Sequence, residues 1–296
     1  MTLTNRLLER NEFSGKVGLA DFIELLIFSF PRIPFTTTRL YALLGDMWGL
    51  EMHHLELAQT EMIRRSQIIG ESYPFVFLNG VPVNRESSNH YIAMLALSHI
   101  QKSNVDESLL SDAYSAKAFE DLAEICLSDF YGAHTRTVNF GFPSEVGRPS
   151  EFGSAISWLS SKIGIQAGTS FRSPRRKDGG VDLVVWKSFG DSRSGIPILL
   201  VQATLQHDIR SKSRDVDRRM WSGWLSMDID PSVAISVPYV LEHSEIWNEV
   251  TRNCLVLDRV RMASMLSQTS REIPASLATS IEALASEMKK TYEEFF

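Results

Sequence analysis

The sequence predicts an α+β protein in which a helical first half is followed by a mixed β-sheet flanked by helices. In the first half, apolar residues recur at the three- and four-residue spacing of amphipathic helices, over residues 22–27, 40–48, 50–69, 91–100 and 115–131. In the second half, β-rich apolar runs predict strands over residues 181–186, 196–204, 233–240 and 254–257. Further helices are expected over residues 151–162, 215–227, 245–251, 259–267 and 276–292. Strands alternating with helices in this way are typical of helices packed on a mixed sheet.

Local signals support several of these boundaries. Asn79-Gly80 marks a turn between two helical stretches. Ser150 is a favourable N-cap for the next helix, and Gly164 is a favourable stop. Residues 188–195 are turn formers, so the strands on either side of them are expected to form a hairpin.

Length and composition favour two globular domains. The chain has 296 residues, of which 44% are hydrophobic and 22% are charged, so it can bury a core and is not disordered. Domains average about 150 residues, and this length therefore predicts two. We expect a helical N-terminal domain over residues 1–112 and a sheet-containing domain over residues 113–296.

Positive charge is concentrated in one stretch of the chain. The whole chain carries a net charge of −6, which excludes a basic, histone-like coat protein. Residues 172–219 nevertheless hold 11 Lys and Arg against 6 Asp and Glu, a local excess of +5. This stretch is where we expect contacts with a polyanion.

Two cysteines, Cys126 and Cys254, are too few for a disulfide framework or a cysteine zinc site, and their sparse use fits a reducing cytoplasm. The most apolar stretch, residues 22–30, contains Glu24 and is shorter than the roughly 20 residues of a membrane span. We expect no membrane partner. The sequence contains no P-loop, GxGxxG or GxSxG motif, so nothing favours a nucleotide hydrolase, a dehydrogenase or a serine hydrolase.

Asp182 and Gln202 are the most informative residues, because each interrupts an apolar strand with a polar side chain. A buried carboxylate without a partner is unfavourable by several kcal/mol, so Asp182 needs a counter-charge, a metal ion or an exposed strand end. If the two strands form a hairpin, both side chains reach the same end of the sheet. Carboxylate and amide oxygens are hard ligands that Mg²⁺ accepts.

These residues carry a family resemblance. Gly-Gly-Val-Asp182, an apolar strand, a turn and then Val-Gln202-Ala-Thr204 resemble the PD-(D/E)XK nuclease superfamily, and most closely its Mrr-type restriction endonucleases. The resemblance covers about residues 113–265. It implies an α-β-β-β-α-β mixed sheet, a Mg²⁺ or Mn²⁺ cofactor, and DNA as the partner.

The resemblance also implies roles for individual residues. Asp182 is the metal-binding acid, and Gln202 stands in place of the usual second acid. A further acid belongs on the preceding helix, where Glu151 is the best match and Glu120 is the second. The lysine of the family motif is missing, because Thr204 occupies its position.

Some members of the superfamily move this lysine to a neighbouring element, and Lys212 is the candidate here. Lys187 is less favoured, because its position five residues after Asp182 turns it to the other side of the strand. Basic residues flank the motif on both sides and are expected to contact DNA phosphates: Arg175, Arg176, Lys177, Arg210 and Arg214.

The sequence therefore predicts a cytoplasmic, metal-dependent endodeoxyribonuclease, in which Glu151, Asp182 and Gln202 hold the metal and Lys212 orients the attacking water. By resemblance, its setting is bacterial restriction or anti-phage defence. One alternative is a catalytically degenerate nuclease fold that binds nucleic acid or scaffolds a defence complex. Another is an interaction module in which the acidic helical half binds a protein partner.

Overall fold

The computed structural model of the chain describes residues 13–85, 90–100, 112–144, 146–169, 173, 174, 178–266, 273 and 275–293. The chain folds into two compact units. The first contains Met1–Ala118, Pro238–Val240 and Arg259–Phe296, and the second contains Phe119–Val237 and Leu241–Asp258.

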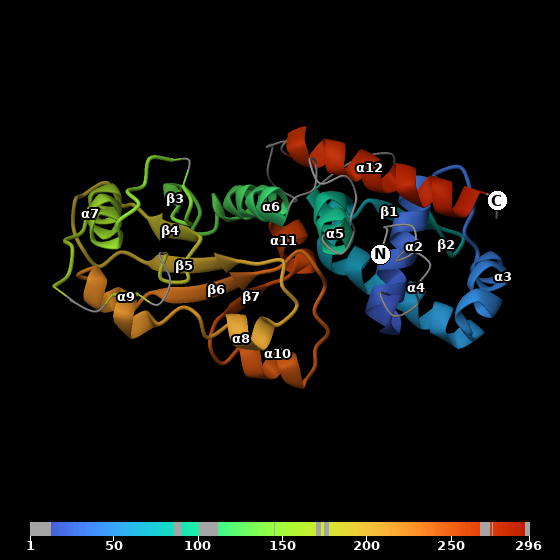
Figure 1. Cartoon of the computed structure of the whole chain (residues 1–296). Helices are drawn as coiled ribbons and strands as arrows, with labels where there is room; N and C mark the ends of the chain where they lie inside the picture. The colour runs from blue at the N-terminus through green and yellow to red at the C-terminus, as the bar shows by residue number, and fades with distance from the viewer. Residues whose placement is uncertain are drawn as a thin grey trace. The chain divides into compact units, whose positions relative to one another are not determined.

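The first unit is built mainly of helices (Figure 1). Its elements are α2 (Gly15–Ser29), α3 (Thr37–Trp48), α4 (Met52–Ile69), the short 3₁₀-helix η2 (Gly70–Ser72), β1 (Phe75–Leu78), β2 (Val81–Asn84), α5 (His90–Ile100), α11 (Arg259–Leu266) and α12 (Ala275–Tyr292). Helix α4 packs on α2 and α11, and α12 packs on α2 and α5. The helical character predicted from apolar spacing is therefore confirmed for this part of the chain.

Two features of this unit differ from our expectation. Strands β1 and β2 form an antiparallel hairpin around Asn79 and Gly80, whose positive φ angles of 52° and 80° suit a tight turn. The sequence indicates that turn but not the strands beside it. The C-terminal helices α11 and α12 also belong to this unit, whereas the sequence prediction places all residues after 112 with the sheet.

Arginine and carboxylate side chains are buried together in the core of the first unit. Arg259 donates to both carboxylate oxygens of Asp21, over 2.9 and 2.7 Å, and Arg65 donates to Asp21 and Glu24 over 2.6 and 2.9 Å. Two tyrosine hydroxyl groups also donate to Glu24. Burial by itself raises the pKa of Asp21, but the charges of Arg259 and Arg65 hold this pKa well below its usual range.

The second unit is organised around a five-stranded mixed sheet. Its strands, in their order across the sheet, are β3 (Thr135–Asn139), β4 (Leu183–Lys187), β5 (Ile198–Ala203), β6 (Ser232–Ser236) and β7 (Leu255–Leu257). β3, β4 and β5 pair antiparallel, whereas β5, β6 and β7 pair parallel. The α+β class and the mixed sheet are thus confirmed.

The helices that accompany this sheet are α6 (Asp112–Leu127), whose residues from Phe119 on belong to this unit, α7 (Phe152–Ile163), α8 (Ile209–Lys212), α9 (Arg218–Trp224) and α10 (Glu245–Val250). Parallel strands need a crossover connection, and α8 and α9 lie in the one between β5 and β6. The helix expected over residues 215–227 is the shorter α9, and α8 before it was not expected; their N-caps are Asp217 and Asp208.

Strand β3 was not expected from the sequence. Its residues, Thr-Arg-Thr-Val-Asn, carry one aliphatic side chain, so they lack the apolar run that marks the other strands. Because its own residues do not mark a strand, β3 is stabilised by its pairing with β4 over five residues. Within the described residues, no helix has both the length and the apolar character needed to cross a bilayer.

Replacing Arg259 by Met is expected to lower the free energy of unfolding by about 3–5 kcal/mol at pH 7, because it leaves the buried Asp21 carboxylate without one of its two arginines. In the wild type, the lowered pKa of Asp21 contributes stability above the unfolded pKa of about 3.9, and this contribution is lost as pH falls through the folded pKa. The variant lacks much of this contribution, so the difference in unfolding free energy between the two proteins should narrow as pH falls below about 3.9. Urea unfolding at pH 7 and at about pH 3 measures it.

Arg261→Met is the matched control, because Arg261 lies on the same helix with an exposed side chain. Its effect is expected to stay within about 0.5 kcal/mol. Equal effects of the two substitutions at pH 7 would contradict the proposed importance of the buried network.

Candidate functional site

Asp182 and Gln202 meet at one end of the sheet. Asp182 directly precedes β4, and the β4–β5 pairing ends with Leu183 opposite Val201, the residue before Gln202. The Asp182 N–H donates to the Val201 carbonyl over 2.9 Å, one residue out of this register. Asp182 and Gln202 therefore lie at the same end of the β4–β5 pair. This is the juxtaposition that we expected from the two polar residues.

The Asp182 carboxylate lies in an unfavourable electrostatic environment. Its Oδ2 accepts a hydrogen bond from the Ala203 backbone N–H over 2.8 Å. Burial raises the pKa of Asp182 well above its usual range, and the nearby Glu120 charge raises it further. The Ala203 hydrogen bond and the Lys212 charge act in the opposite direction but do not cancel these effects. A positive charge placed beside Asp182 would favour its ionised form.

Glu120, on α6, supplies the second carboxylate of the site. Its Oε2 accepts a hydrogen bond from Asn139 Nδ2 over 3.3 Å, which ties the side chain to the end of β3. Its charge acts on Asp182, as the raised pKa of that residue shows. Glu120 was the second choice for the acid on the preceding helix, and the structure favours it over the first.

Glu151, the first choice, has a different role in the structure. It is the N-cap of α7, where its two carboxylate oxygens accept hydrogen bonds from the backbone N–H groups of Gly153 and Ser154, over 2.9 and 2.6 Å. These two N–H groups lower the pKa of Glu151. The carboxylate satisfies the first turn of its own helix, and we replace it by Glu120 in the candidate site.

A third acid, Asp215, organises the other side of the site. Its Oδ2 accepts a hydrogen bond from Gln202 Nε2 over 3.2 Å and lies 3.6 Å from Lys212 Nζ. The reverse orientation of the Gln202 amide would place its oxygen against the Asp215 carboxylate. We did not identify Asp215 from the sequence, although its position three residues after Lys212 is the spacing of a helical ion pair.

The orientation of Gln202 leaves one polar atom unsatisfied. Gln202 Oε1 is buried and accepts no hydrogen bond from any residue that the structure describes. A buried acceptor without a partner costs about 1–3 kcal/mol. The atom is therefore available to a ligand at the same end of the sheet as Asp182.

Lys212 is the lysine that approaches the site. Its side chain is 13% exposed, and its charge lowers the pKa of Asp182. Thr204, at the lysine position of the family motif, is buried, and its hydroxyl accepts a hydrogen bond from a backbone N–H two residues later. Lys187 lies at the opposite end of β4 from Asp182, where its Nζ donates to two backbone carbonyls of the loop before β3.

The glycines before Asp182 bring the Asp215 segment close. Gly179 and Gly180 have positive φ angles of 64° and 81°, and the Gly180 N–H donates to Asp178 Oδ1 over 2.8 Å. A Cβ atom at Gly180 would lie 2.9 Å from the Asp215 carbonyl oxygen. Only glycine permits both the backbone conformation and this approach, so the Gly-Gly pair positions Asp215 beside the β4–β5 end.

The five basic residues assigned to DNA contacts have different outcomes. Arg175, Arg176 and Lys177 lie outside the described residues. Arg210 and Arg214 flank Lys212 in the chain, and both form ion pairs with Glu249 of α10, each over 2.9 Å.

The chemistry of the donor set fits a hard divalent cation. It offers the carboxylates of Asp182 and Glu120 and the unsatisfied amide oxygen of Gln202, and oxygen ligands of this kind suit Mg²⁺ and Mn²⁺. Across the described part of the chain, no three His, Cys, Asp or Glu side chains gather closely enough to hold a metal by themselves.

Comparisons with known proteins add no family assignment. No protein-family model matches the chain, and no curated protein or solved structure matches it either.

Asp182→Asn is expected to stabilise the metal-free protein by about 0.5–2 kcal/mol at pH 8, as is common where a site is built at the expense of stability. The physical reason is that the raised pKa of Asp182 makes the buried charge destabilising once pH exceeds the folded pKa. The gain should disappear below the unfolded pKa of about 3.9, where both states are protonated. Thermal unfolding with a chelator, across a pH series, measures the effect.

Asp191→Asn, in the exposed loop between β4 and β5, removes the same charge without relieving burial. It is expected to leave the unfolding temperature almost unchanged. If Asp182→Asn destabilised the protein at pH 8, the carboxylate would be well compensated in the folded state, and its environment would not be the unfavourable one inferred from its raised pKa.

Proposed function

We propose that the second unit is a metal-dependent endodeoxyribonuclease of the PD-(D/E)XK type. The observation that carries the proposal is the meeting of Asp182 and Gln202 at one sheet end with Glu120 and Lys212. Two carboxylates, an amide oxygen and an amine are the groups that metal-assisted phosphodiester hydrolysis needs. The four residues that carry these groups come from different parts of the chain, so it is the fold that brings them together.

The connectivity of the second unit supports the same proposal. Helix α6, the antiparallel strands β3, β4 and β5, a helical crossover and the parallel strand β6 follow one another in the α-β-β-β-α-β order that the resemblance implies, with α7 inserted between β3 and β4. Asp182 stands at the start of the second strand and Gln202 near the end of the third. The proposed acid on the first helix is Glu120.

Asp182, Glu120 and Gln202 Oε1 would hold a Mg²⁺ or Mn²⁺ ion. Such an ion polarises a phosphodiester and lowers the pKa of an attacking water. The protein would keep Gln202 Oε1 turned toward the ion through the Nε2 hydrogen bond to Asp215. The repulsion between Asp182 and Glu120, which raises the pKa of Asp182, would be relieved when the cation binds.

Lys212 would supply the positive charge that the family places at position 204. Its Nζ is restrained beside Asp215 rather than extended into solvent. From there it would orient the attacking water and stabilise the negative charge that develops on the phosphate. Thr204 leaves no amine at the position where the family carries its lysine. Lys212 would supply that amine from a neighbouring helix, and this argues against a catalytically degenerate fold.

The wider assignments extend beyond this site. A role in bacterial restriction or anti-phage defence, and a cytoplasmic setting, follow from the resemblance and belong to the proposal. The helical first unit is proposed to bind a protein partner that controls the nuclease unit.

Wild-type protein is expected to cleave plasmid and single-stranded DNA when Mg²⁺ or Mn²⁺ is added. Asp182→Ala and Glu120→Gln should each reduce the cleavage rate by at least about 100-fold, and Lys212→Ala should reduce it by about 10²–10⁴-fold, the usual range for loss of a group that assists proton transfer. Gel-based cleavage with and without a chelator measures these rates.

Glu151→Gln and Lys187→Ala are the matched controls, because they remove a carboxylate and an amine that the structure uses elsewhere. Both variants should retain activity within about threefold. Cleavage that survives Asp182→Ala would refute the site. Salt-sensitive DNA binding without any cleavage would favour the degenerate nuclease fold.

Asp215→Asn tests the proposed orientation of Gln202 and Lys212. It removes the negative charge that pairs with Lys212 and leaves a neutral, weaker acceptor for Gln202, so the metal concentration for half-maximal cleavage should rise about 10–100-fold, as is usual when an outer ligand partner is lost. A purely structural defect would instead lower the unfolding temperature and leave this metal dependence unchanged. Metal titration of the cleavage rate and thermal unfolding of the same variant separate the two results.

A further inference from the structure

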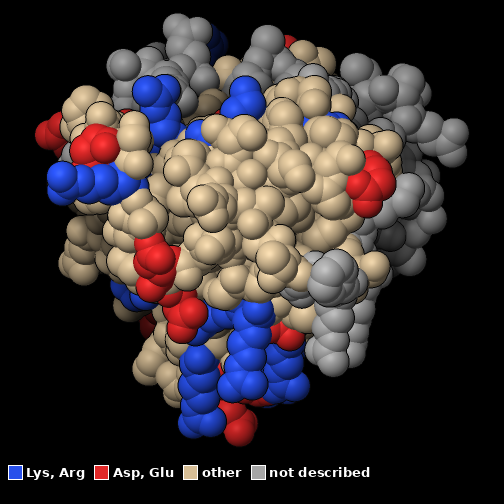
Figure 2. Space-filling model, turned by 90° about the vertical axis from the view of Figure 1, so that its left-hand side faces the viewer, with Lys and Arg blue, Asp and Glu red and all other residues tan. Residues whose placement is uncertain are grey.

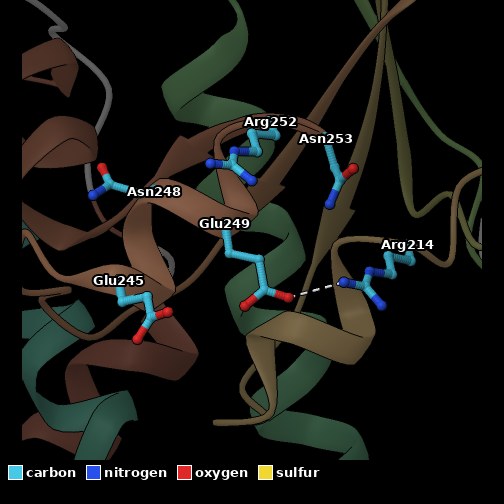
Figure 3. A pocket seen from close by; sticks show the side chains of 6 residues that line it. All are labelled: Arg214, Glu245, Asn248, Glu249, Arg252 and Asn253. Atoms are coloured by element: carbon cyan, nitrogen blue, oxygen red, sulfur yellow. Dashed lines mark hydrogen bonds and ion pairs between the residues drawn. The ribbon is translucent and has the colours of Figure 1, made fainter.

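A polar pocket lies between α8 and α10 in the second unit. It encloses about 470 Å³ and is lined by Arg214, Glu245, Asn248, Glu249, Arg252 and Asn253. Figure 3 shows Glu249 directed from α10 toward Arg214, with Asn253 beyond the end of the same helix. None of the six lining residues is aromatic or aliphatic.

The pocket lining is neutral overall, with Arg214 and Arg252 against Glu245 and Glu249, and two further arginines contact it. Arg210 and Arg214 each bond one carboxylate oxygen of Glu249, so a single acid is shared by two arginines. Arg218 donates to the backbone carbonyl of Asn253 at the border of the pocket. The Arg252 side chain forms no ion pair with any described residue and is exposed.

The pocket is connected to the candidate active site through one short segment. Arg210 and Arg214 are directed to Glu249 of α10, whereas Asp215, in the same segment, accepts a hydrogen bond from Gln202 and pairs with Lys212. Residues of this one segment thus contribute both to the polar pocket and to the candidate active site. A strand of nucleic acid that passes over α8 would contact both.

We propose that this pocket binds a backbone phosphate of the nucleic-acid strand that the candidate active site cleaves. The proposal rests on the proposed nuclease function and names the second contact point of the same substrate. Arginine presents a planar fork of donors that matches phosphate oxygens, and the two asparagine amides add neutral donors. Without an aromatic side chain for a base to stack on, the pocket is suited to the backbone and not to base recognition.

The surrounding surface fits this role. Figure 2 shows Lys and Arg side chains gathered at the lower border of the face in view, with Asp and Glu among them, in the part of the molecule where α8, α9 and α10 lie in Figure 1. Arg210, Arg214, Arg218, Arg219 and Arg252 are all exposed in this part of the second unit. A phosphate backbone is attracted by such a group of arginines, and the attraction weakens as salt is added.

The test is the affinity of the full-length protein for a fluorescent single-stranded oligonucleotide and its duplex, measured in a chelator so that no cleavage occurs. Arg214→Ala combined with Arg252→Ala is expected to weaken binding at least tenfold. The log–log slope of affinity against salt should become shallower by about one unit for each phosphate that the variant no longer neutralises. The matched control is Arg193→Ala, an arginine 85% exposed in the loop between β4 and β5, which should change affinity less than threefold. Equal effects of the pocket and control variants would overturn the proposal.

Glu249→Gln provides a test of opposite sign. It removes the carboxylate that competes with phosphate for Arg210 and Arg214, so binding should tighten several-fold. If the pocket were only a structural ion-pair cluster, the same substitution would leave affinity unchanged or weaken it. Inorganic phosphate and a mononucleotide serve as competitors, and binding of either as tightly as the oligonucleotide would show a small-ligand site instead.

The two proposals fail in different ways. Pocket-dependent binding without cleavage by the wild type would support the phosphate contact and refute the nuclease function. Metal-dependent cleavage that is indifferent to Arg214→Ala, Arg252→Ala and Glu249→Gln would support the nuclease and overturn the phosphate contact. A protein that binds no oligonucleotide at low salt would overturn the phosphate contact as well.

Discussion

The unfavourable burial of the Asp182 carboxylate is the constraint that accounts for the other features of the candidate site in the second unit. It is held at the end of a sheet by the Ala203 backbone N–H, close to another carboxylate, Glu120, that makes its charge still less favourable. A sequence selected for stability alone would place an apolar residue there. The surrounding features, including the shared Asp215 acceptor and the unsatisfied Gln202 oxygen, are explained if this end of the sheet exists to receive a positive charge.

The fold brings the site together through backbone constraints as much as through side chains. The antiparallel pairing of β4 and β5 places Asp182 and Gln202 at the same end of the two strands, and the close approach at Gly180 brings Asp215 near them. Lys212 then follows because it lies three residues before Asp215 in the same crossover. The parallel pairing of β5 and β6 requires that crossover, so the sheet topology places Lys212 near the candidate site.

Much of the second unit could be predicted from local pattern, and the exceptions have identifiable causes. Apolar runs revealed β4 through β7, whereas β3 is polar at four of its five residues and depends on pairing with β4. Asp182 and Gln202 were visible because polar residues inside apolar strands are unusual. Glu151 was ranked above Glu120 from the sequence, and the order is reversed because tertiary structure decides which acid caps a helix and which one approaches Asp182. The buried network of the first unit joins residues more than 200 positions apart, a separation that local pattern does not reveal.

The most direct test of the metal site is a crystal structure of the protein soaked in Mn²⁺, with the metal located by anomalous scattering. We predict one strong peak bound by Asp182, Glu120 and Gln202 Oε1, with Lys212 still beside Asp215. A peak elsewhere, or none, with Gln202 Oε1 satisfied by an ordinary hydrogen bond, would contradict the claim that this sheet end is a metal-dependent active site.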